Sequence, residues 1–97
     1  MATPHESRGV YAISVAAELV GVGVQTLRLY ETRGLVEPSR TGGGTRRYSA
    51  LDLDRARRIV ELLEAGLNLA GVAMVLELEA ENAELREQVA RRSRGAR

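Results

Sequence analysis

Arg, Gln and Thr side chains gather in one short segment of the first half of the chain, at spacings that suit the recognition of DNA. Gln25, Thr26 and Arg28 stand close together, and Arg46 and Arg47 follow after a glycine-rich turn. Gln and Arg can each form paired hydrogen bonds to a purine edge, and Arg also binds phosphate oxygens. DNA is therefore the first partner that these residues predict.

A first short helix should precede these residues and support them. Five residues outline its apolar side, and Ser14 stands where it could cap the helix. Gly21 and Gly23 then break the pattern. The alanine pair on the apolar side would let a second helix approach closely. The five apolar residues are Tyr11, Ile13, Ala16, Ala17 and Leu19.

A second helix, predicted from Val24 to Arg33, should carry the groups that read DNA. Val24, Leu27 and Tyr30 recur every three residues and should face the core. The polar residues on or near the opposite face are Gln25, Thr26 and Arg28.

A β-hairpin, called the wing below, is predicted after the second helix. Gly34 is placed to end the helix in a left-handed conformation. Leu35–Val36 are expected to form the first strand, which Pro38 would end. Residues 41–45 should form the tip and residues 46–48 the second strand.

The two adjacent arginines of the second wing strand must differ in role. Because neighbouring strand residues face opposite ways, only one of Arg46 and Arg47 should face DNA. Two short helices around a tight turn, followed by a hairpin, make a winged helix-turn-helix. We therefore expect a mainly α fold with a small β-hairpin wing.

Two further helices should follow the wing. Ser49 and Asp52 are spaced as a capping pair that opens the third helix, which should end near Gly66. Asn68 can cap the fourth, where Gly71 costs about 1 kcal/mol relative to Ala and is explained by close helix packing. The expected core residues of these helices are Leu53, Ala56, Ile59, Val60, Leu63, Leu69, Val72, Val75 and Leu76.

A short C-terminal dimerisation helix is predicted from alternating steps of three and four residues. Asn82 would be the one polar residue of the seam, a device that can fix register and partner number. Since barely two heptads are present, a single helix folding back on its own domain is the alternative. The predicted dimerisation residues are Val75, Leu78, Asn82, Leu85 and Val89.

The predicted organisation has three parts. Residues 1–9 should be a disordered tail, residues 10–76 the DNA-binding domain, and residues 77–97 the dimerisation helix with a basic tail that either touches phosphate or frays. The chain is expected to stop soon after the dimerisation helix, without an effector domain.

Composition excludes several other functions. The chain has no Cys and a single His, His5, so we expect no catalytic constellation, no metal site and no cofactor. An enzyme is disfavoured for the same reason. The absence of a signal sequence or apolar span predicts a cytoplasmic protein associated with the nucleoid.

Charge is segregated along the chain although the net charge is only +1. Residues 25–58 hold eight Arg against four acidic residues, a net charge of +4. Residues 59–90 hold one Arg against seven Glu, a net charge of −6. The basic part therefore suits phosphate, and the acidic part does not. The Glu-rich part is interpreted as a solvated helix face and not as a metal site.

The sequence resembles the MerR-type transcription regulators from about residue 11 to residue 78. Stretches 13–19, 25–30, 46–49 and 68–71 are most similar to the HspR branch of heat-shock repressors. The family pattern is matched by Thr26-Leu27-Arg28, Tyr30-Glu31, Gly34-Leu35, Pro38 and Arg46-Arg47-Tyr48.

The resemblance implies a homodimer that binds an inverted-repeat operator and represses heat-shock or chaperone genes. It also implies that an Hsp70-class chaperone acts as co-repressor. Together with the residue pattern, it assigns DNA contacts to Ser14, Gln25, Thr26, Arg28, Tyr30, Arg33, Arg40, Arg46, Arg47 and Tyr48.

Two alternatives stay open at this point. A chaperone-modulating adaptor could keep this fold and use it against protein, but it would not need the arginines of the recognition helix and wing. A MerR-type activator would share the DNA-binding half and differ in how it distorts the promoter.

Overall fold

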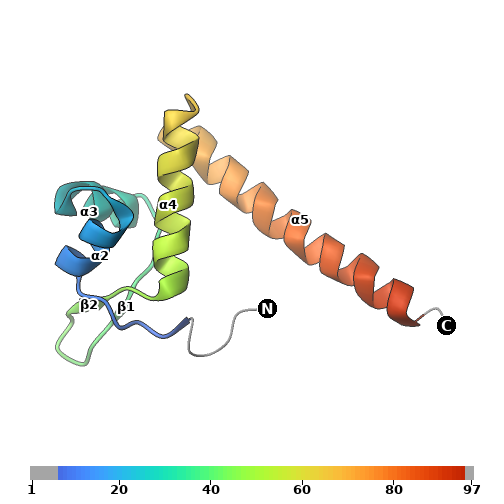
Figure 1. Cartoon of the computed structure of the whole chain (residues 1–97), viewed down its shortest axis with the longest axis horizontal. Coiled ribbons are helices and arrows are strands. Elements are labelled where there is room, and N and C mark those ends of the chain that lie inside the picture. The colour runs from blue at the N-terminus through green and yellow to red at the C-terminus, as the bar shows by residue number, and fades with distance from the viewer. Residues whose placement is uncertain (1–6, 96–97) are drawn as a thin grey trace. The chain divides into compact units, whose positions relative to one another are not determined.

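The computed structural model describes residues 7–95 and is mainly helical (Figure 1). Residues 1–6 of the predicted tail and residues 96–97 lie outside the described residues. The chain forms two compact units, which meet in sequence between Glu61 and Leu62. The elements are α2 (Ile13–Val20), α3 (Val24–Thr32), β1 (Ser39–Arg40), β2 (Arg46–Arg47), α4 (Ala50–Glu64) and α5 (Leu69–Gly95).

Helices α2 and α3 pack against each other as the helix-turn-helix (Figure 1). Ala16 and Ala17 are 0% and 3% exposed, so the small side chains allow the close approach that the sequence predicted. Gly21 ends α2 with a φ of 86°, and its N–H donates to the carbonyl of Ala17 at 2.9 Å. Leu27 and Tyr30 of α3 are buried. The predicted fold class, a mainly helical winged helix-turn-helix, is confirmed.

Two details of the predicted first helix are wrong. Ser14 does not cap it, because the helix already begins at Ile13 and Ala12 occupies the N-cap position without a side-chain hydrogen bond. Leu19 is 47% exposed, because this eight-residue helix buries only its alanine pair.

The wing begins later than the sequence predicted. Leu35 and Val36 are 4% and 1% exposed, and two successive strand residues would face opposite sides. They join the core instead of forming a strand. The first strand starts only beyond Pro38, which has no N–H to donate to a ladder. Antiparallel pairing then sets Ser39 opposite Arg47 and Arg40 opposite Arg46.

The segment before α2 extends the pairing of the wing. Tyr48 donates its N–H to the carbonyl of Tyr11 at 2.7 Å, and Tyr11 donates to Tyr48 at 2.9 Å. Gly9 lies so close to the wing that a Cβ there would fall 2.6 Å from the carbonyl oxygen of Arg47. Only glycine permits this approach. The predicted second strand is therefore confirmed at Arg46–Arg47 and continues as a single bridge at Tyr48.

The predicted capping pair opens α4. Ser49 N–H donates to Oδ2 of Asp52 at 2.8 Å, and Asp52 N–H donates to Oγ of Ser49 at 3.0 Å. Leu53, Ala56 and Ile59 are buried, as predicted from their spacing. Gly66, with a φ of 103°, follows the helix.

In the second unit, α5 is one continuous helix of 27 residues. Asn68 caps it as predicted, because its Oδ1 accepts the N–H of Gly71 at 2.8 Å. A Cβ at Gly71 would meet Oδ1 of Asn68 at 3.4 Å and Leu67 at 3.6 Å. Gly71 therefore borders the cap, and the nearest neighbours of such a Cβ lie in the turn before α5. Val72 and Leu76 are buried.

The helices of residues 7–95 include none with the length and apolar character that crossing a membrane requires.

Candidate nucleic-acid interface

The outward face of α3 presents a short row of side chains suited to contact with base edges. Its members recur at steps of three and four residues, which places them on one side of the helix. Leu27 and Tyr30, buried on the opposite side, hold this face outward. The exposed row consists of Gln25, Arg28, Leu29 and Thr32.

This row combines different recognition chemistries. An amide and a guanidinium can each bind a purine edge, and a hydroxyl can donate or accept. Leu29 is 41% exposed and adds an apolar group of the kind that contacts a thymine methyl. Thr26 is half-buried beside the row, and Arg33 is exposed at the end of the helix.

Glu31 of α3 joins the helix to both strands of the wing. Its Oε1 pairs with Nη2 of Arg40 at 2.6 Å, and its Oε2 accepts a hydrogen bond from Nε of Arg46. Arg46 therefore turns toward α3. Its neighbour Arg47 is half-buried and donates to the carbonyl of Arg46 at 3.3 Å.

Both tyrosines that the sequence assigned to DNA are buried. Tyr30 is 2% exposed and Tyr48 is 0% exposed. Burial raises the pKa of the Tyr30 hydroxyl. Burial also raises the pKa of Tyr48, and the charge of Glu31 adds to this effect. Neither ring forms part of the exposed α3 face, whereas Ser14 is exposed on α2.

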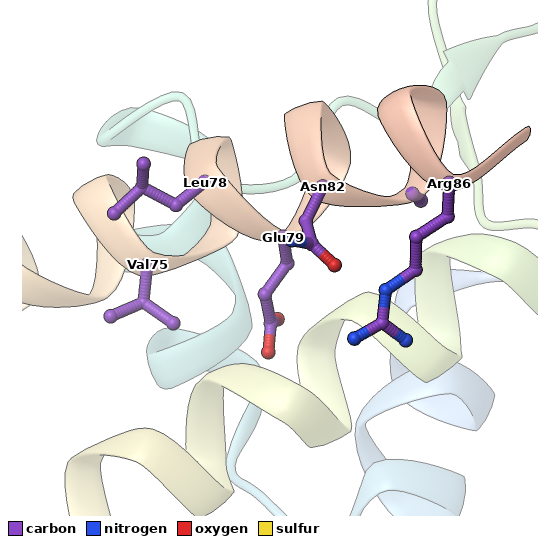
Figure 2. Close-up of a pocket in the computed structure, with 6 residues that line it drawn as sticks. Val75, Leu78, Glu79, Asn82 and Arg86 are labelled. Carbon is purple, nitrogen blue, oxygen red and sulfur yellow. The ribbon is translucent and has the colours of Figure 1, made fainter. Parts of the chain in front are cut away.

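Helix α5 carries the predicted dimerisation residues, and most of them are exposed. Leu78, Leu85 and Val89 are 60%, 58% and 63% exposed. Figure 2 shows Val75, Leu78 and Asn82 along α5, where they border an open groove with Glu79, Ala83 and Arg86. A row of large exposed apolar side chains is unusual for a surface with no partner.

Three side chains at or beside the exposed row were not predicted from the sequence. Leu29 and Thr32 could have been found by counting three, four and seven residues from Gln25, which continues one helix face. Glu31 belongs to the matched family pattern, but its pairing carried no local signal, because its partners lie nine and fifteen residues further along the chain. In the part of the chain from 7 to 95, no cluster of His, Cys, Asp or Glu could hold a metal ion.

Comparison of the sequence with known families identifies a match of residues 11–79 to the MerR HTH family of regulatory proteins. A Streptomyces coelicolor protein that carries the name heat shock protein HspR is 49% identical over 86 residues. This match covers 88% of the present chain and 57% of that relative. The chain thus spans less than two thirds of that relative's length.

Solved structures of MerR regulators have a similar fold. HiNmlR, described as a MerR regulator lacking the sensor domain and bound to promoter DNA, superposes with a TM-score of 0.65 at 25% identity, covering 87% of this chain and 76% of that one. The regulator PbrR691 of Ralstonia metallidurans CH34, in complex with lead(II), gives 0.70 at 26% identity, covering 84% and 71%.

These relatives are regulators and not enzymes, which confirms the expectation that the chain is not an enzyme. The matched residues include both helices of the helix-turn-helix, the wing, α4 and the first part of α5. This chain belongs to the MerR HTH family of regulatory proteins.

Proposed function

We propose that this chain is a sequence-specific DNA-binding transcription regulator that acts as a homodimeric repressor of heat-shock genes. The observation that carries the proposal is the exposed row on α3, with the wing arginines fixed beside it by Glu31. HiNmlR, whose fold is similar, is described as bound to promoter DNA.

The proposed contacts divide into base reading and positioning. In the major groove, Gln25 and Arg28 read purine edges, with Thr26 and Arg33 beside them. Arg40 and Arg46 of the wing bind phosphates, which fix the register of the protein but carry no sequence information, whereas Arg47 leaves β2 on the opposite side. Ser14, exposed on α2, is placed to meet the backbone.

The proposed homodimer forms along α5. Burial of Leu78, Leu85 and Val89 against a second copy would remove their exposed apolar area from water. Asn82 would pair with its counterpart in the same seam and fix the register. A two-fold dimer reads an inverted repeat, with half-sites spaced by whole helical turns of roughly 34 Å.

The heat-shock target rests on the identity of 49% with the HspR relative. The same resemblance supports an Hsp70-class chaperone as co-repressor and, for a DNA-bound protein, association with the nucleoid. No feature of the described residues favours activation or an adaptor role over repression.

Selection of bound fragments from the genome of the source organism, using the purified protein, tests the proposal. Enrichment of inverted repeats upstream of chaperone genes is expected. Enrichment of repeats at other genes would contradict the regulation of heat-shock genes but would still support sequence-specific DNA binding. Transcription from an enriched promoter should fall when the protein is added, and a rise would assign activation instead.

A substitution at Arg28 then tests which residues read the operator. Arg28→Ala should lose about 1–3 kcal/mol of specific binding if the guanidinium contacts a base. Arg92→Ala removes the same charge from an exposed position of the basic tail, where any contact is with phosphate, so it should change the affinity for every duplex equally and controls for the lost charge. Equal affinity of the unchanged protein for all duplexes, together with retention of a chaperone on the protein, would favour the adaptor.

A further inference from the structure

The carboxylate of Glu31 lies between two arginines that come from opposite strands of the wing. Nη2 of Arg40 on β1 is 2.6 Å from Oε1, and Nε of Arg46 on β2 donates to Oε2. The Glu31 side chain is 18% exposed, compared with 47% for Arg40 and 30% for Arg46. Water therefore screens this bridge less than it screens an ordinary surface pair.

The bridge offsets a repulsion that the register of the wing creates. Arg40 and Arg46 are direct cross-strand partners, and like charges at such positions destabilise a sheet. Each strand is only two residues long, and an isolated hairpin is marginally stable at best. A carboxylate between the two guanidinium groups turns the repulsion into two attractive contacts.

The same contacts extend to the tip of the wing. Nη1 of Arg40 donates to the carbonyl of Gly44 at 2.9 Å, so one guanidinium joins the tip to Glu31. Arg46 uses its Nε for the bridge, which leaves both of its Nη amines for an acceptor such as a phosphate oxygen. A guanidinium held by a carboxylate on one edge is thus oriented for a second anion on the other.

We propose that Glu31 is a positioning residue, which fixes the spacing between the wing and α3 so that phosphate and base contacts are made together. This inference rests on the proposed DNA-binding function. The direction of the change in binding distinguishes this role from simple charge repulsion. A carboxylate near DNA repels phosphate, so its loss alone should strengthen binding to every duplex. A positioning role predicts instead that its loss weakens the preference for the operator.

The test compares Glu31→Gln with Glu37→Gln, measuring dissociation constants for a selected operator and for a scrambled duplex. Glu37 is an exposed residue in the loop between α3 and β1, so it controls for the lost charge. Glu31→Gln is expected to lower the operator preference by about tenfold, the factor for one lost charge-assisted hydrogen bond. Glu37→Gln should leave the preference unchanged.

A preference kept in full by Glu31→Gln, with both duplexes bound more tightly, would overturn the role of Glu31 and leave the proposed function intact. Equal binding of both duplexes by the unchanged protein would overturn the proposed function, and the positioning role with it. An Arg46→Gln background adds a third check, because Glu31→Gln should then reduce the operator preference much less.

A spectroscopic measurement on the unchanged protein tests the bridge even if Glu31→Gln does not fold. The Nε proton of Arg46 should exchange with water more slowly than that of Arg92, an exposed arginine of α5. Positioning requires that this protection persists in the complex with the operator. Exchange as fast as that of Arg92, in the free or the bound protein, would overturn the proposal.

Discussion

Replacement of Tyr48 by Phe is expected to stabilise the fold, although Tyr48 is among the most deeply buried side chains. Its ring is 0% exposed. Within residues 7–95, its hydroxyl is the one buried side-chain oxygen or nitrogen without a hydrogen-bond partner. Buried polar groups are normally paired, because an unpaired group has lost its hydrogen bonds to water without replacement.

The expected gain follows from two opposing contributions. Burial of an unpaired hydroxyl costs about 1–3 kcal/mol, which Phe would recover. Removal of the oxygen leaves a space of about 10–15 Å³, and at about 24 cal/mol per Å³ this space costs about 0.3 kcal/mol. The free energy of unfolding should therefore rise by about 1–2 kcal/mol.

The gain should become larger at high pH. Burial, with the charge of Glu31, raises the pKa of Tyr48 above its usual 10.0. The unfolded chain therefore releases its phenol proton at a lower pH than the folded protein, and the contribution of Tyr48 to stability falls as pH rises above 10. The Tyr48→Phe variant has no phenol proton to release at this position, so the difference between the two proteins should widen in that range.

Urea unfolding, followed by circular dichroism at one fixed protein concentration, measures the effect without interference from dimerisation. Tyr30→Phe is the control, because this ring is also buried but its hydroxyl is not an unpaired buried atom. A higher midpoint with an unchanged slope is expected for Tyr48→Phe only. A lower midpoint that corresponds to a loss of about 1 kcal/mol in the free energy of unfolding, the value of an ordinary hydrogen bond, would refute the reasoning.

Two further substitutions test the α4 cap and the α5 seam. Ser49→Ala should lower the free energy of unfolding by about 1–2 kcal/mol, because it removes the acceptor for the N–H of Asp52. Ser14→Ala, an exposed control on α2, should change it by less than about 0.5 kcal/mol, and equal effects would exclude the cap. Leu85 is 58% exposed, so its burial in both copies of a dimer should contribute about 2–4 kcal/mol to the free energy of dimerisation. Leu85→Glu should therefore raise the dimer dissociation constant by ~30-fold or more. Sedimentation measures the dimer dissociation constants of this variant and of Ala80→Glu, a control on the opposite side of α5. Equal dissociation constants for the two variants would contradict the proposed seam.

The sequence predicted those parts of the fold that depend on nearby residues. The Ser49–Asp52 cap, the Asn68 cap and the left-handed Gly34, with a φ of 72°, all involve contacts within three or four positions. The buried pair of Leu27 and Tyr30 also followed from a local period. Such features depend on contacts between residues that are near in sequence, so the residue types and their spacing are enough to predict them.

The errors arose where distant parts of the chain meet. Leu35 and Val36 have the composition of a strand, but both side chains are buried in the core. Tertiary packing therefore overrides their strand propensity. The start of α2 depends on the pairing of Tyr11 with Tyr48, which are 37 positions apart in sequence. This pairing holds the chain directly before Ala12, which occupies the N-cap, and Ser14 lies inside the helix.

The adjacent pair Tyr30 and Glu31 illustrates why a family motif needs a structure to be interpreted. Successive residues of an α-helix point about 100° apart, so the two side chains leave α3 in different directions. Tyr30 enters the core, whereas Glu31 reaches the wing arginines. With Glu31 as a positioning residue and Tyr30 in the core, neither residue of this motif reads a base. Both residues act on DNA binding only by placing Arg28 and Arg46. Substitutions at Tyr30 or Glu31 should therefore change the affinity for every operator by the same factor. Substitutions at Gln25 or Arg28 should instead change which base is preferred at one position of the operator.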